Sequence, residues 1–175
     1  MKPEAFIERF KSAQPDLPSD IDIELAVFHP FHVDEVKVLP ISEVDKEFLL
    51  VGLPEDATPY LSFFPSLRRF VDIDPYLGDD FSAFIALGHN GSGDYICLDT
   101  RDGKIIYHNH DNGMQEVFIN SSIEKFAETL CLFAESALVN YASPFLKDLG
   151  SIDPPAVEPS AMWFSEYHMM REEFA

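Results

Sequence analysis

Residues 81–120 have the sequence FSAFIALGHNGSGDYICLDTRDGKIIYHNHDNGMQEVFIN, in which short apolar runs alternate with turn residues. The runs predict strands at 84–87, 95–98, 104–108 and 115–119. Asp102-Gly103 is a strong hairpin signal, because glycine adopts the positive φ that the favoured hairpin turns require. Strands joined by such short turns pair as antiparallel neighbours. This stretch therefore predicts a β-meander.

A glycine-rich segment connects the first two of these strands. A phosphate-binding loop would need the backbone donors of a helix N-terminus, and this segment leads into a strand instead. We interpret its glycines as residues with backbone angles closed to other residue types, and Asp94 as a hydrogen-bonding partner in the turn. The structural turn residues that we expect are Gly88, Gly91, Gly93, Asp94, Asp102 and Gly103.

Helical signals flank the meander on both sides. Amphipathic or capped segments predict helices at 3–13, 42–51, 122–141 and 160–173. In the helix at 122–141, we expect Phe126, Leu130 and Leu138 to pack on the meander. For the last helix, the expected packing residues are Trp163, Tyr167 and Met170.

The remaining segments carry weaker signals. Alternating valines predict a strand at 33–39, and a proline-interrupted aromatic pattern predicts an irregular strand or edge element at 58–70. A proline-rich, acidic linker is expected at 150–159. Together these elements predict an α+β fold with a mainly antiparallel sheet, built on the central meander with helices packed around it. The length favours a single domain over residues 1–175.

Acidic residues dominate the charge, with 31 Asp and Glu against 12 Lys and Arg and a net charge of −19. Nucleic acids and anionic membranes bind basic patches, so the charge argues against both partners and permits a basic protein partner. Acidity that serves only solubility is the alternative explanation. The absence of a leader-like N-terminus, of a long apolar run and of a CxxC motif favours a cytoplasmic location.

Two clusters are candidates for chemistry or binding. His108, His110 and Asp111 could ligate a metal or form a small hydrolase site, but turn chemistry also explains this segment, and we expect no metal, no cofactor and no catalysis. The other cluster is an acidic loop around Pro75, and an acidic loop with an aromatic anchor is typical of an interface. Its candidate partner-binding residues are Asp72, Asp74, Tyr76, Asp79 and Asp80. A solvated loop without a partner is the alternative.

The order and spacing of several motifs resemble the SUKH superfamily, which includes fungal cell-wall regulators and bacterial immunity proteins. The motifs are FLLVGLP at 48–54, LGHNGSGDYICLD at 87–99, GKIIY at 103–107 and NSSIEKF at 120–126, and the resemblance covers about 42–140. It implies an α+β fold and a bacterial immunity protein that binds and neutralises a cognate toxin. The negative charge would suit a basic toxin such as a nuclease. A regulatory scaffold that recruits a cellular partner is the alternative function.

Overall fold

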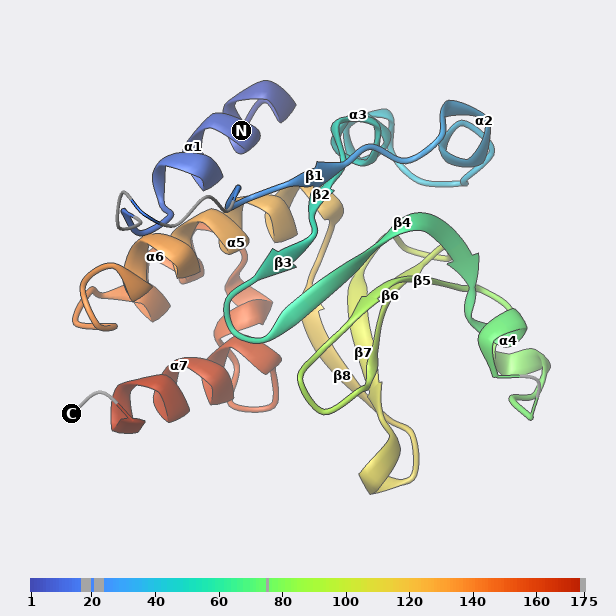
Figure 1. Cartoon of the computed structure of the whole chain (residues 1–175). Helices are drawn as coiled ribbons and strands as arrows, with labels where there is room; N and C mark the ends of the chain where they lie inside the picture. The colour runs from blue at the N-terminus through green and yellow to red at the C-terminus, as the bar shows by residue number, and fades with distance from the viewer. Residues whose placement is uncertain (17–19, 21–23, 75, 174–175) are drawn as a thin grey trace.

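The computed structural model describes residues 1–16, 20, 24–74 and 76–173 (Figure 1). The helices are α1 (Pro3–Ser12), α2 (Val33–Val36), α3 (Glu43–Val51), α4 (Phe70–Ile73), α5 (Ile123–Ala137), α6 (Phe145–Ile152) and α7 (Met162–Glu173). Short 3-10 turns are η1 (Asp79–Phe81), η2 (His110–Asn112) and η3 (Pro154–Val157). The strands are β1 (Phe28–His29), β2 (Leu53–Pro54), β3 (Asp56–Ala57), β4 (Leu61–Arg69), β5 (Phe84–His89), β6 (Tyr95–Asp99), β7 (Ile105–Asn109) and β8 (Gln115–Asn120).

Within the described residues, a six-stranded sheet has the order β3-β4-β5-β6-β7-β8, and every neighbouring pair is antiparallel. The predicted meander is confirmed as β5 to β8, and the α+β class is confirmed with it. β4 lies inside the sheet, and its register to β5 shifts between Phe63 and Arg68, around Pro65. Proline cannot donate a ladder hydrogen bond, so an irregularity at this point is expected. The sheet edge at this side is the two-residue strand β3.

One face of the sheet is covered by helices. The main core joins Leu87, Ile96 and Leu98 of the sheet to fully buried side chains of α1, α3, α5, α6 and α7. Phe126 of α5 contacts Phe63 of β4 with ring centroids 5.8 Å apart. The expected packing residues of α7, which are Trp163, Tyr167 and Met170, are all buried. Figure 1 shows these helices on the side of the sheet opposite to α4.

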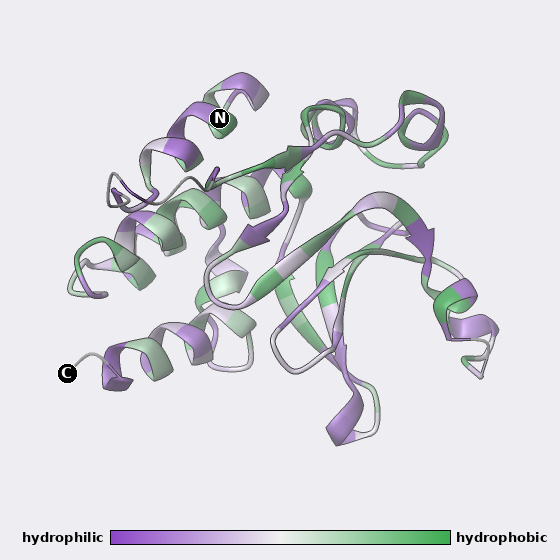
Figure 2. Ribbon diagram, in the orientation of Figure 1, coloured by the Kyte–Doolittle hydropathy of each residue, from purple (hydrophilic) through white to green (hydrophobic). Residues whose placement is uncertain are grey.

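The opposite face of the sheet is covered only in part. A smaller core of Phe70, Phe84, Ala86, Cys97 and Ile106 lies there, and the segment from α4 to η1 packs on it. Figure 1 shows α4 at the far end of the molecule from α1 and α7. In Figure 2 the η2 turn is strongly hydrophilic, as expected for a turn in solvent. This second face therefore leaves turns and polar groups accessible next to a small apolar core.

Two serines begin helices as their sequence signals predict. Ser42 Oγ accepts a hydrogen bond from the Asp45 N–H at 3.1 Å, and Ser122 Oγ accepts one from the Lys125 N–H at 3.2 Å. Such N-cap contacts satisfy backbone donors that a helix leaves unpaired in its first turn. The beginnings of α3 and α5 are thus locally encoded.

The predicted strand at 33–39 is wrong, because residues 33–36 form the short helix α2. Val36 is buried, whereas Val33 and Val38 are exposed. Two alternating valines do not distinguish a strand from one helical turn, and the acidic pair Asp34 and Glu35 suits the first turn of a helix. Residues 33–36 are therefore a short helix and not part of a strand.

Leu138 was expected in the packed face of the long helix, and this prediction is wrong. α5 ends at Ala137, and the Leu138 side chain is 50% exposed, whereas Phe126 and Leu130 are fully buried. A helical position packs only while the helix continues over the sheet. The helical periodicity extends past the point where α5 leaves the core.

The predicted linker at 150–159 is also wrong. α6 continues to Ile152, η3 follows directly, and Asp153 between them is completely buried. Prolines at the first positions of η3 are compatible with a helical turn, so the composition was a poor guide to a linker. This segment is folded, and it buries Asp153 and Ala156.

Asp153 is the centre of a buried network that we call the Asp153 network, comprising Asn120, Ser121, Lys125, Thr129, Asp153 and Trp163. Its Oδ2 accepts hydrogen bonds from Asn120 Nδ2 (3.1 Å) and the Ser121 N–H (2.7 Å). Its Oδ1 accepts from Ser121 Oγ (2.7 Å) and Lys125 Nζ (3.2 Å). Trp163 Nε1 donates to Asn120 Oδ1 at 2.8 Å, and Asn120 Nδ2 also donates to Thr129 Oγ1 at 3.1 Å. The network ties β8, α5, α7 and the segment after α6 together.

Candidate functional site

The acidic loop predicted as a partner-binding site runs from α4 to η1. Asp72, Asp79 and Asp80 are exposed, Asp74 is half-buried, and Tyr76 is 99% exposed. Arg69 Nη1 lies 3.9 Å from Asp72 Oδ1 at the surface, a distance at which an ion pair contributes little. Pro75, which was also part of the prediction, lies outside the described residues. The loop thus presents carboxylates and one unpacked aromatic ring to solvent.

The turn between β5 and β6 is closed by Asn90. Asn90 Oδ1 accepts hydrogen bonds from the N–H groups of Ser92 and Asp94 at 3.0 and 2.9 Å. Asn90 Nδ2 donates to Asp94 Oδ2 at 3.1 Å. A Cβ added at Gly88 would lie 2.2 Å from the Ser62 carbonyl oxygen of β4, so a side chain there would force the two strands apart. These contacts hold Asp94 in a defined place.

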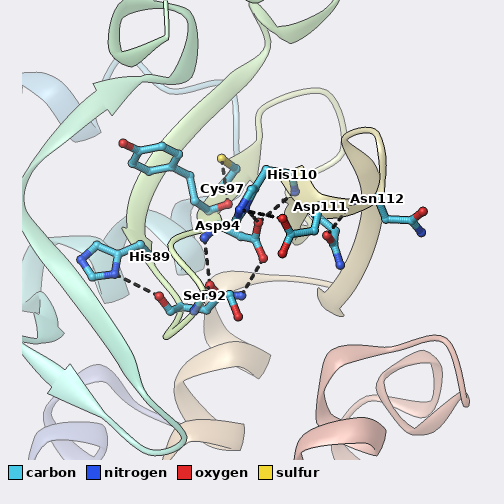
Figure 3. Close-up of polar contacts among 10 residues, drawn as sticks. His89, Ser92, Asp94, Cys97, His110, Asp111 and Asn112 are labelled. Carbon is cyan, nitrogen blue, oxygen red and sulfur yellow. Dashed lines mark hydrogen bonds and ion pairs between the residues drawn. The ribbon is translucent and has the colours of Figure 1, made fainter.

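Asp94 connects this turn to the turn after β7. Its Oδ1 accepts hydrogen bonds from the His110 backbone N–H at 3.0 Å and from His110 Nδ1 at 2.6 Å (Figure 3). Burial raises the pKa of Asp94, but the hydrogen bonds from His110 and Asn90 outweigh it, so the net pKa is lowered. The hydrogen bond to Asp94, helped by the charge of Asp111, raises the pKa of His110 above 6.5. The two residues therefore form a charge-assisted pair.

His108 lies beside this pair in an apolar environment. Its ring is stacked on Phe70 (centroids 5.7 Å apart) and meets Phe81 and Phe84 edge-on at 5.0 and 4.7 Å. The side chain is 6% exposed, and Nδ1 has no hydrogen-bond partner among the described residues. Burial lowers the pKa of His108 below 6.5, so the ring is neutral at pH 7. Leaving a buried polar atom unpaired typically costs about 1–3 kcal/mol.

Asp94, His108 and His110 line one cavity of about 340 Å³, which we call the Asp94 cavity. Its wall consists of Phe70, Asp74, Ser92, Gly93, Asp94, Tyr95, His108, His110 and Met114. The structure thus brings Asp74 of the acidic loop together with His108 and His110, which sequence analysis treated as separate candidates. It leaves Tyr76, Asp72, Asp79 and Asp80 outside this wall.

Sequence analysis missed this cavity, although one signal for part of it was available. In a meander, successive turns alternate between the two ends of the sheet, so the turn after β5 and the turn after β7 lie at the same end. Asp94 and His110 could therefore have been expected to be neighbours. The approach of Asp74 from α4 has no such local signal.

The structure also places the residues that were candidates for metal binding or hydrolysis. Among the residues that the structure describes, no three His, Cys, Asp or Glu side chains come together as a metal site. Asp111 is exposed, with Oδ1 3.3 Å from His110 Nε2, while the His108 ring is enclosed by phenylalanines, so the three side chains do not meet at one point. The Cys97 and Cys131 thiols are buried, and burial raises the pKa of each, which disfavours the reactive thiolate.

Comparison with known proteins identifies the family. A family model described as SUKH-4 immunity protein matches residues 27–168, from the segment before β1 into α7. No curated protein and no solved structure matches the chain. Between residues 1 and 173, none of the described helices combines the length and apolar character of a bilayer span. The family match covers far more than half of the sequence and includes all six strands of the main sheet, so the chain belongs to the SUKH-4 immunity protein family.

Proposed function

We propose that this protein binds and neutralises a cognate bacterial toxin with a basic contact surface, such as a nuclease domain, in the cytoplasm of the cell that makes both proteins. The observation that carries the proposal is the acidic loop of a SUKH-4 family member: Asp72, Asp74, Asp79 and Asp80 flank Tyr76 in the sequence, and Tyr76 is 99% exposed. Neutralisation then requires tight binding and no chemical step.

Electrostatics supports a basic partner. A nuclease must present cationic side chains to phosphates, and an acidic protein can occupy the same surface. With a net charge of −19, the whole molecule attracts such a partner, and a local cluster of carboxylates orients it. Charge therefore contributes mainly to the rate of association.

The anchoring of the loop supports its use as an interface. Leu77 and Phe81 are half-buried and pack on the smaller core, beside the buried Phe70 of α4. The loop is thus held at both ends while Tyr76 projects into solvent. A preorganised loop loses less conformational entropy on binding, and exposed tyrosines are frequent hot spots.

The test is the binding kinetics of the toxin domain encoded beside this protein's gene. Changing Asp72, Asp74, Asp79 and Asp80 together to Asn should slow association by about tenfold at low salt and less at high salt, where charges are screened. Tyr76→Ala should instead speed dissociation.

A matched control removes the same charge elsewhere. Changing the exposed residues Glu4, Glu8, Glu43 and Glu47 of α1 and α3 together to Gln lowers the net charge equally. We expect a clearly smaller effect on association from this variant. If both quadruple variants slow association equally, only the net charge of the protein matters and the loop has no special role. If association and dissociation rates are unchanged in the loop variants, the toxin does not bind at the loop.

A further inference from the structure

The Asp94 cavity contains carboxylate groups with unused acceptor capacity. Asp74 Oδ1 accepts a hydrogen bond from the Tyr76 N–H at 3.0 Å, and no cation pairs with Asp74 in the described part of the chain. Asp94 Oδ2 accepts only from Asn90 Nδ2, at 3.1 Å. A carboxylate offers about four lone-pair sites. Both groups can therefore accept further hydrogen bonds from a guest.

Aromatic rings form the apolar part of the wall. The rings of Phe70 and Tyr95 lie with centroids 5.5 Å apart, and Met114 adds a thioether to the lining. Aromatic faces attract cations, and the planar guanidinium of arginine also stacks on them. The cavity thus combines aromatic surface with negative charge.

His108 is a further residue of the same wall, and its buried Nδ1 has no hydrogen-bond partner among the described residues. The ring is neutral, so one of its nitrogens is an acceptor without a proton. Almost every buried polar atom in a folded protein has a partner, so this exception needs an explanation. Nδ1 is closed to solvent in the free protein, and the ring adds aromatic surface to the cavity wall.

We propose that the Asp94 cavity holds the guanidinium group of one arginine side chain of the protein partner. The inference rests on the proposed function, because it names a contact of that same partner. Asp94 is paired with His110, so Asp74 carries the negative charge of the wall that no cation balances among the described residues. Asp74 would repel an anion, and an apolar guest would bury its carboxylate without a cation. Lysine has three donors and no planar face, whereas arginine has five donors in a fixed plane. Asp74 belongs to both the cavity and the acidic loop, so one partner can contact both.

The first experiment needs no toxin. Nα-acetyl-arginine methylamide is titrated at millimolar concentration into the isotope-labelled protein, and the side-chain NMR signals of Tyr95, His108 and Met114 are followed. Saturable shifts of these signals are expected. The citrulline analogue, which has nearly the same shape without the charge, should bind at least about tenfold more weakly. Equal binding of both probes, stronger binding of the lysine analogue, or no saturable shift would overturn the proposal.

Two cavity variants sharpen the result. Asp74→Asn keeps a carbonyl oxygen for the Tyr76 N–H and loses the charge, and Tyr95→Leu removes one aromatic face. Each should weaken binding of the arginine probe by about tenfold. Asp34→Asn, an exposed change on α2, is the matched control and should leave probe binding unchanged. Unaltered probe affinity in both cavity variants would also overturn the proposal.

The toxin domain then separates this inference from the proposed function. Tyr95→Leu and His108→Phe lie in the cavity wall but outside the acidic loop, so a faster dissociation of the toxin from these variants supports the arginine contact. If the toxin binds both variants as it binds the wild type, the arginine contact is overturned while the proposed function stands. If the arginine probe binds in the cavity but the toxin domain does not bind the wild-type protein, the cavity is a guanidinium site and the proposed function is wrong.

Discussion

The Asp153 network and the Asp94 cavity both place polar groups against the main sheet, but they differ in how completely these groups are paired. In the network, both oxygens of Asp153 accept two hydrogen bonds each, and Asn120 is bonded through both its oxygen and its nitrogen. In the cavity, His108 Nδ1 has no partner and two carboxylates have spare acceptor sites. Complete pairing stabilises a fold, whereas carboxylates with spare acceptor sites in a cavity wall can form further hydrogen bonds with a bound group.

The largest expected effect comes from breaking the complete network. Asp153→Ala leaves Asn120, Ser121 and Lys125 without their acceptor, and removing one member of a buried charged network typically costs about 3–5 kcal/mol. Urea denaturation should show this loss in the free energy of unfolding. Asp148→Ala, an exposed change in the same helix α6, is the control and should stay within about 0.5 kcal/mol. A small loss for Asp153→Ala would mean that the network does not stabilise the fold.

The apolar packing around the network gives the next effect. Leu130 is fully buried in α5, and Leu130→Ala should lower the free energy of unfolding by about 2–5 kcal/mol, as large-to-small core changes do. Leu138→Ala is the same chemical change at a 50% exposed position just after α5, and it should cost less than about 0.5 kcal/mol. Similar losses in both variants would contradict the end of the packed face that the structure shows.

Removing the unpaired group in the cavity should have the opposite sign. His108→Phe replaces a neutral, buried imidazole by a ring that suits its three phenylalanine neighbours, so it should raise the free energy of unfolding by about 1 kcal/mol. His89→Phe on β5 is the control, because His89 is half-exposed and its Nδ1 lies 3.2 Å from the Asn90 carbonyl oxygen. No gain is expected there. Destabilisation by His108→Phe would show that the histidine is well satisfied in the free protein.

The smallest effect concerns the pairing of Asp94 with His110. The folded-state pKa of His110 is raised, so its contribution to stability is complete below about 6.5 and is lost as pH rises through the folded pKa. The folded-state pKa of Asp94 is lowered, so its contribution is complete above about 3.8 and is lost as pH falls through the folded pKa. The coupling between the two groups should therefore be greatest between about pH 4 and 6.5.

A double-mutant cycle measures this coupling. Asp94→Asn, His110→Asn and the double variant are compared with the wild type by urea denaturation at pH 5.5 and pH 9. The coupling free energy should be larger at pH 5.5. If the coupling free energy is equal at the two pH values, the positive charge of His110 does not contribute to the contact with Asp94.

Local sequence signals were sufficient for the meander and for the starts of its flanking helices. Asp102-Gly103 predicts a chain reversal, Gly103 has a φ of 82° in the turn between β6 and β7, and Ser42 and Ser122 bond to donors three residues away. Such interactions depend on neighbours along the chain, so the residue types are enough to predict them. The same local reasoning failed at 33–39, where two alternating valines also fit a helical turn.

The Asp153 network and the complete wall of the Asp94 cavity were decided by the tertiary structure, although the meander pattern indicates that the turns of Asp94 and His110 lie at the same end of the sheet. Asp153 bonds to Asn120 from 33 residues away, within a segment whose composition is typical of a linker, and Asp94 bonds to His110 from 16 residues away. Asp74 reaches the cavity because α4 packs back on the uncovered face of the sheet. Burial changes the energy of a polar group only after distant segments exclude water from it, so the same aspartate can be a solvated surface charge, the centre of a core network or the wall of a binding cavity.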